Sequence, residues 1–285
     1  MADNQPQFAA FPKLTDRLRR LAALALVPVW LFTAAPAQAL DPEQRAEIDN
    51  FVAGNVVFTL FHELGHALID MLQLPTLGRE EDAADNLAAI LMIGEPGAAQ
   101  TDELVFAAAD GWAMLHESSQ TSGEPAPFWD SHSLDIQRYH IMLCLMYGSD
   151  PNGFADVIEA ADLPDERREG CAEEYEKTVA SWTDVLEPHM KRFGDGARGK
   201  IKVAWDVPNS TQNTKARARV KAMALDRILS GVVSGNVALP ANLVLRFANC
   251  GEPNAFYDPE KREIAMCYEL VTSFAEMIEA DIRRQ

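Results

Sequence analysis

The chain has 285 residues, and its 43 Asp and Glu residues outnumber its 25 Lys and Arg residues, which gives a formal net charge of −18 at pH 7. Such an excess of negative charge repels nucleic acids and anionic lipids, so we expect neither as a partner. Hydrophobic residues make up 48% of the chain. The length suits one large domain or two closely packed lobes.

The first 39 residues have the features of an export signal. Residues 13–20 carry four positive charges and one negative charge, and residues 21–35 form an apolar run of 15 residues that is short for a membrane span. Ala37-Gln38-Ala39 fits the small-x-small rule for cleavage. We therefore predict that residues 1–39 are removed, that the protein is secreted or periplasmic, and that no stable membrane anchor remains. The alternative is that the same run is a membrane anchor.

Four cysteines follow the predicted signal, and an even number in an exported chain indicates two disulfides. Three pairings are possible. We favour Cys144–Cys171 and Cys250–Cys267, because each pair is local in the sequence. If the protein is not exported, free buried thiols become the better interpretation.

The chain from residue 40 to about residue 190 is predicted to be helical. The segment 51–74 contains no proline and is apolar on nearly every face, so we expect a buried helix that stops at Pro75. Glycine, proline and polar clusters separate the segments that follow. The helices expected after the first span residues 79–93, 102–118, 133–147, 154–161 and 165–187.

The character of the chain changes after residue 190. Glycines at 194, 196 and 199 suggest a flexible link. We expect strands at 201–205, 243–247 and 263–267, and helices at 214–229 and 270–282. The predicted fold class is therefore α+β and mainly helical, with a helical lobe at 40–190 and a small α+β lobe at 191–285.

The most informative stretch is His62-Glu63-Leu64-Gly65-His66, which matches H-E-x-x-H. Residues four apart share one face of a helix, so both imidazoles can reach one metal ion. Glu63 lies beside the first histidine, where its carboxylate can take a proton from a metal-activated water. The alternative is a structural pair of histidines that binds no metal.

A catalytic zinc site needs a third protein ligand and one open position. Glu81 and Asp85 are four residues apart on one face of the next predicted helix. One of them can bind the metal, while the other can accept a hydrogen bond from a histidine ring and so fix its tautomer. Glu80 remains an alternative third ligand. A mixed set of histidine and glutamate suits Zn²⁺ better than calcium or magnesium.

Hydrolysis of an amide also needs a donor for the oxyanion that forms. His132 lies at a predicted junction of loop and helix and is our first candidate, with Asp130 or Asp135 to hold its ring. Arg138 and Tyr139 are second choices. An equally simple interpretation is that His132 caps a helix or lies at the surface.

The zinc motif, followed by Glu81-x-x-x-Asp85, resembles the gluzincin pattern of thermolysin-like metallopeptidases. The resemblance implies that Glu81 is the third zinc ligand and that Asp85 orients a zinc-binding histidine. The connection from His66 to Glu81 is short for thermolysin itself, which leaves Glu80 and Asp85 open as ligands.

A second resemblance concerns Asn254-Ala255-Phe256-Tyr257, which is similar to the edge strand of thermolysin-like enzymes. There the Asn side chain and the Ala backbone bind an extended peptide substrate, a mode of recognition that tolerates many sequences. The alternative is an ordinary hairpin turn. In most zincins this strand precedes the zinc helix, whereas here it follows, so the resemblance implies a zincin-like fold in permuted order.

Most of the chain from residue 50 to 275 resembles a bacterial family of metallopeptidase-like proteins catalogued as a domain of unknown function. The resemblance implies a zinc metalloendopeptidase-like hydrolase that acts on a peptide or protein substrate, whereas the oligomeric state stays open. The rival is a catalytically inactive, zinc-bearing peptide-binding or scaffold protein of the cell envelope. The matching segments are 62–70, 78–88, 132–138, Cys144, 147–151, 250–255 and 267–270.

Overall fold

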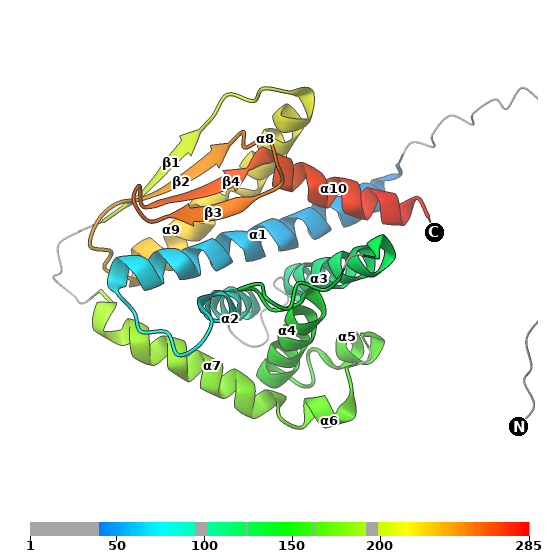
Figure 1. The fold of residues 1–285 in the computed structure, drawn as a ribbon, viewed down its shortest axis with the longest axis horizontal. Coiled ribbons are helices and arrows are strands. Elements are labelled where there is room, and N and C mark those ends of the chain that lie inside the picture. The colour runs from blue at the N-terminus through cyan, green and yellow to red at the C-terminus, as the bar shows by residue number, and fades with distance from the viewer. Residues whose placement is uncertain (1–39, 95–101, 124, 162, 192–198, 285) are drawn as a thin grey trace, which may run out of the picture. The chain divides into compact units, whose positions relative to one another are not determined.

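The computed structural model describes residues 40–94, 102–123, 125–161, 163–191 and 199–284 (Figure 1). The predicted export signal at 1–39 and most of the predicted glycine link lie outside these residues. Residues Leu40–Gln285 form one compact unit by their contacts.

The central element is the helix α1 (Pro42–Leu72), which has 31 residues. It begins earlier than predicted, because the Asp41 side chain accepts hydrogen bonds from the backbone amides of Glu43 and Gln44, while the Asp41 backbone amide donates to the Gln44 side chain. It ends where Gln73 adopts a left-handed conformation with φ of 53°. The helix is long and apolar enough to cross a membrane, but 83% of its most apolar window is buried, as in a core helix.

Helices cover one side of α1. The helices α2 (Glu80–Ile93) and α3 (Asp102–Ser122) pack directly against it (Figure 1). The predicted helix at 165–187 is two helices, because the chain turns at Glu169 and Gly170. The further elements of this layer are α4 (Asp135–Ser149), α5 (Ala155–Ala160), α6 (Asp165–Arg168), α7 (Cys171–Leu186) and the 3₁₀ turn η1 (Glu187–His189).

A four-stranded sheet lies on the other side of α1, in the order β1-β2-β4-β3 (Figure 1). The first three of these strands are parallel, and β3 is an antiparallel edge strand beside α1. The segment that follows Asn254 therefore forms an edge strand and is not only a hairpin turn. The strands are β1 (Ile201–Trp205), β2 (Leu243–Ala248), β3 (Ala255–Asp258) and β4 (Glu263–Cys267).

Three helices accompany the sheet: α8 (Thr211–Met223), α9 (Leu225–Asn236) and α10 (Tyr268–Ile282). The single helix predicted at 214–229 is interrupted, because Ala224 adopts a left-handed conformation with φ of 52°. The helix α9 packs against β1, while α10 packs against α8 and α1. The fold is thus mainly helical α+β with a small mixed sheet, as predicted.

Both disulfides have the pairing favoured from the sequence. Cys144–Cys171 joins α4 to the start of α7. Cys250–Cys267 joins the segment before β3 to the end of β4. Two disulfides indicate an oxidising environment, such as the periplasm or the outside of the cell.

The helices α1 and α2 pack closely at Gly65, which has no side chain to hold them apart. A Cβ atom at this position would lie 2.9 Å from the Cα and 3.0 Å from the Cβ of Ala84. On its other side α2 is held by Trp182 of α7, whose Nε1 donates to the carbonyl of Ala83 at 3.2 Å. The first turn of α2 is therefore fixed against α1.

We predict that Gly65→Ala lowers the free energy of unfolding by about 1–3 kcal/mol, because the added methyl group meets helix backbone that cannot yield without moving α2. Gly231→Ala in α9 is the matched control, since a methyl group there meets nothing within 4 Å. The control should be neutral or stabilising, because alanine favours helix. Chemical denaturation measures both, and equal stability of Gly65→Ala and the parent protein would contradict the packing described.

Candidate metal centre

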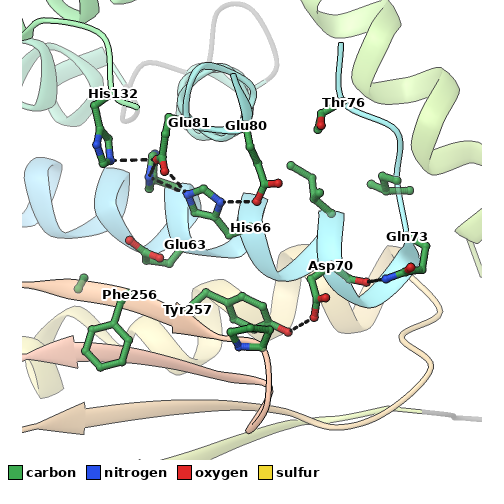
Figure 2. Close-up of a pocket in the computed structure, with 15 residues that line it drawn as sticks. Glu63, His66, Asp70, Gln73, Thr76, Glu80, Glu81, His132, Phe256 and Tyr257 are labelled. Atoms are coloured by element: carbon green, nitrogen blue, oxygen red, sulfur yellow. Dashed lines mark hydrogen bonds and ion pairs between the residues drawn. The ribbon is translucent and has the colours of Figure 1, made fainter. Parts of the chain in front are cut away.

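Three ligand-type atoms from two helices meet at one point. The Nε2 atoms of His62 and His66, both on α1, are 3.1 Å apart. Each lies 3.2 Å from Oε2 of Glu81 in the first turn of α2 (Figure 2). Hydrogen bonds from His132, His62 and His66 hold the pKa of Glu81 far below its ordinary value. We call the three atoms of His62, His66 and Glu81 the donor triangle.

Both histidines of the donor triangle are held from behind by carboxylates of α2. Nδ1 of His62 donates to Oδ1 of Asp85 at 2.7 Å, and Nδ1 of His66 donates to Oε1 of Glu80 at 2.8 Å. With its Nδ1 hydrogen-bonded in this way, each ring directs Nε2 toward the triangle. Burial lowers the pKa of His66, but hydrogen bonds to Glu81 and Glu80 outweigh it and raise the value to about 9.

Asp85 is in turn fixed by Arg138 of α4. Nε of Arg138 donates to Oδ2 of Asp85 at 2.6 Å, and Nη2 donates to Oδ1 at 2.5 Å. The guanidinium group lies over the ring of Trp112, 3.5 Å from its centre. Burial raises the pKa of Asp85, but His62 and Arg138 together hold it below the ordinary value. Asp85 therefore stays ionised behind His62.

A third histidine faces the same glutamate. Nε2 of His132 lies 2.9 Å from Oε2 of Glu81, and its Nδ1 donates to Oδ1 of Asp130 at 2.9 Å. Arg79 fastens this loop to α2 by donating to the carbonyl of His132 at 3.3 Å and to Oγ of Ser133 at 2.8 Å. His132 therefore lies at the site, and Asp130 rather than Asp135 holds its ring.

Glu63 lies between α1 and the edge strand β3 and is only 6% exposed (Figure 2). The backbone amide of Tyr257 in β3 donates a hydrogen bond to its carboxylate. Burial raises the pKa of Glu63 despite the nearby histidines. The carboxylate is therefore a stronger base than an exposed glutamate.

The donor triangle opens into a cavity of about 680 Å³. Its walls come from α1, the first turn of α2, the loop of His132, and β3 with the adjoining Pro259. Glu63, Ala255 and Tyr257 all line this space. A group bound in the cavity would therefore contact the donor triangle, the carboxylate and the sheet edge together.

Three residues named from the sequence lie elsewhere than expected, and Glu80, the alternative third ligand, does not reach the donor triangle. Arg138 does not line the cavity, because it is directed at Asp85. Tyr139 packs against the ring of His140, with ring centres 5.2 Å apart, and does not line the cavity either. Asn254 is exposed outside the cavity, with its carbonyl accepting from the amide of Cys267. Glu80 contacts the far side of the His66 ring, away from the donor triangle.

Asp70 is not among the residues expected at the site, yet it lines the cavity and accepts a hydrogen bond from the Tyr257 hydroxyl at 2.8 Å. The sequence does contain one indication of this position. Asp70 follows His66 by four residues, and this spacing places the two side chains on one face of α1. Trp112, beneath Arg138, was also missed, since no sequence pattern indicates that contact.

The donor triangle fits a divalent metal ion. Four ligands arranged tetrahedrally at zinc distances lie roughly 3.3 Å from one another, close to the separations of 3.1–3.2 Å observed here. His62 and Glu81 also form a looser group with His132, in which all ligand atoms lie within 4.8 Å. The set with His66 is the tighter one, and its two histidines share one helix face. Two imidazoles and one carboxylate are a donor set typical of zinc.

Residues 31–186 and 206–285 match the model of a family described as "Putative metallopeptidase". The chain belongs to this family. Membership in this metallopeptidase family supports a hydrolase and implies a metal, which the histidine and glutamate side chains at this site could hold. No curated protein and no solved structure matches the chain.

We predict that Arg138→Lys weakens zinc binding about 10–100-fold, the usual effect of losing a residue that orients a metal ligand. Lysine cannot make both bonds to Asp85, so the ring of His62 loses its fixed orientation. Arg246→Lys is the matched control, because Arg246 makes the same kind of double contact, at 3.0 and 3.1 Å, with Asp206 in the sheet. Competition with a coloured chelator measures the affinities, and an equal loss in both variants would contradict the positioning role.

Proposed function

We propose that the protein is an exported zinc-dependent metallopeptidase that hydrolyses peptide bonds. The observation that carries this proposal is the donor triangle, which opens into a cavity beside the buried carboxylate of Glu63. The two disulfides and the signal-like residues 1–39 support export.

In this proposal His62, His66 and Glu81 hold the zinc ion, and Asp85 and Glu80 keep the two imidazoles oriented. When bound, zinc polarises the substrate carbonyl and increases the acidity of water. Because the carboxylates of Asp85 and Glu80 restrict rotation of the imidazole rings, the ligand atoms are already in position before the substrate binds.

Glu63 is the proposed general base. It takes a proton from the attacking water and passes it to the leaving amine. Its buried position favours proton uptake, and the amide of Tyr257 holds the carboxylate toward the cavity. Water is the nucleophile, so no covalent acyl-enzyme forms.

His132 is the proposed donor to the substrate carbonyl oxygen as negative charge develops on it. Its Nε2 faces the donor triangle, and Asp130 holds the opposite side of the ring. The contacts with Glu81 and Asp130 raise the pKa of His132 above its ordinary value, with the Glu81 contact the larger cause. A protonated imidazole is the form that can donate to the developing oxyanion.

The edge strand β3 is the proposed support for an extended peptide. The carbonyl of Asn254 is directed at β4, so by the alternation of a β-strand the backbone groups of Ala255 and Tyr257 are directed away from it. The hydrogen bond from Tyr257 to Glu63 agrees with this alternation. Ala255 thus offers its amide and carbonyl to a substrate strand. A zinc helix beside an antiparallel edge strand supports a zincin-like architecture in permuted order.

The short contact between His132 and Glu81 favours a second candidate. If His132 filled the remaining coordination position, the metal site would be closed, as structural zinc sites are. The protein would then be a zinc-bearing peptide-binding or scaffold protein of the cell envelope. Metal content and peptide cleavage, measured on the same protein, separate the two candidates.

We predict that Glu63→Gln retains zinc but lowers kcat/KM on peptides at least ~10²-fold, because the amide cannot take the proton from water. Glu47→Gln is the matched control, since it makes the same change at an exposed position of α1. Zinc analysis and digestion of a mixed peptide library measure both properties. Equal cleavage by the parent protein and Glu63→Gln would contradict the assigned base, and a zinc-loaded parent that cleaves nothing would favour the second candidate.

A further inference from the structure

We propose that the end of the cavity beyond the donor triangle is a subsite for a lysine or arginine side chain of the substrate, and that Asp70 recognises its positive charge. The inference rests on the proposed function, because it assigns a substrate class to that same site. It is carried by the position of one carboxylate, the charge of the cavity and the character of its walls.

Asp70 lies on α1, one helical turn beyond His66, and its carboxylate reaches into the cavity toward β3 (Figure 2). Oδ2 accepts a hydrogen bond from the Tyr257 hydroxyl at 2.8 Å. Within the described parts of the chain, Asp70 has no salt bridge, and no side chain donates to its Oδ1. This oxygen is therefore available to a group that enters the cavity.

The lining of the cavity has more acidic than basic groups. The described residues that line it include four carboxylates, those of Glu63, Asp70, Glu80 and Glu81, and three histidines, and none of these lining residues is lysine or arginine. A divalent ion together with one protonated histidine would offset only part of the charge of the four carboxylates. The C-terminal end of α1 lies at the same side and has no basic residue in its last turn, so the helix dipole adds negative potential. A cationic side chain is attracted by all of these charges, whereas an anionic one is repelled.

The cavity also offers apolar surface for the long stem of a basic side chain. Ile69, Leu74, Pro259 and the ring of Tyr257, whose hydroxyl donates to Asp70, are among its lining residues. Lysine and arginine bury their methylene groups against such surfaces while the charged end meets a polar group. The aromatic ring adds an attraction for a cation placed over its face.

The subsite lies close to the proposed reaction. Asp70 follows His66 by four residues, which is about 6 Å along a helix. An extended peptide advances roughly 3.3 Å per residue. The recognised side chain therefore belongs to a residue within about two positions of the scissile bond.

Binding to the zinc-loaded Glu63→Gln protein tests the subsite without turnover. The probes are two series of fluorescent peptides with an otherwise neutral sequence. One series carries a single lysine, placed at each position in turn. The other series carries norleucine at the same positions, which keeps the apolar stem but removes the charge. We expect lysine at one position to bind roughly fivefold more tightly than norleucine, the upper end of the range for one charge pair that solvent can reach. This preference should weaken as salt is added.

In the Glu63→Gln protein, Asp70→Asn should abolish the preference for lysine over norleucine. Asparagine can still accept a hydrogen bond from the Tyr257 hydroxyl, but it carries no charge. Asp49→Asn is the matched control, since it makes the same charge change at an exposed position near the other end of α1. It should leave the preference unchanged. Equal binding of the lysine and norleucine peptides, or a lysine preference that survives Asp70→Asn, would overturn the subsite.

Cleavage by the parent protein separates this inference from the proposed function. Cleavage of neutral peptides as readily as basic ones would overturn the subsite and leave the peptidase standing. A lysine preference that depends on Asp70, without any cleavage, would support the subsite and contradict the peptidase. If no peptide binds the zinc-loaded protein at all, both are overturned.

Discussion

The candidate metal centre depends on the close packing of α1 against α2 at Gly65. Because no side chain separates the helices there, the first two turns of α2 lie near enough for their carboxylates to meet the histidines of α1. The first two turns of α2 thus supply a ligand-type oxygen from Glu81 and the support for both rings from Glu80 and Asp85. The positions of Arg138 and the His132 loop also depend on this contact, because both are hydrogen-bonded to α2 or to its N-cap residue.

The elements on the two sides of α1 contribute different groups to the site. On the helical side, Arg138 and the loop of His132 are fastened to α2, so that the positions of Asp85 and His132 are set by the same helix. On the sheet side, β3 contributes a hydrogen bond to Glu63 and an exposed edge of backbone. The cavity lies between these two sides, where metal chemistry and recognition of an extended chain can act on the same bond.

Local sequence signals predicted much of this arrangement. The spacing of four residues places His62 and His66 on one helix face, and the same spacing places Glu81 and Asp85 on the facing side of α2. Most of the helices, three of the four strands and both disulfides were also predicted, whereas the helices expected at 165–187 and 214–229 are each interrupted. The parts that sequence could not supply depend on contacts between distant segments. Arg138 and Tyr139 are substrate-binding candidates from the sequence because they follow His132. The packing of α4 instead directs Arg138 at Asp85 and places Tyr139, partly buried, beside His140. The break at Ala224 reflects a left-handed residue that its identity does not indicate.

The most direct test of the central claim is anomalous diffraction at the zinc edge from crystals of the zinc-loaded protein. The account predicts one strong peak about 2.0–2.2 Å from Nε2 of His62, Nε2 of His66 and a carboxylate oxygen of Glu81, with Asp85 and Glu80 still bound to the opposite nitrogens of the two rings. A peak elsewhere, or an ion coordinated without His66 or Glu81, would contradict it.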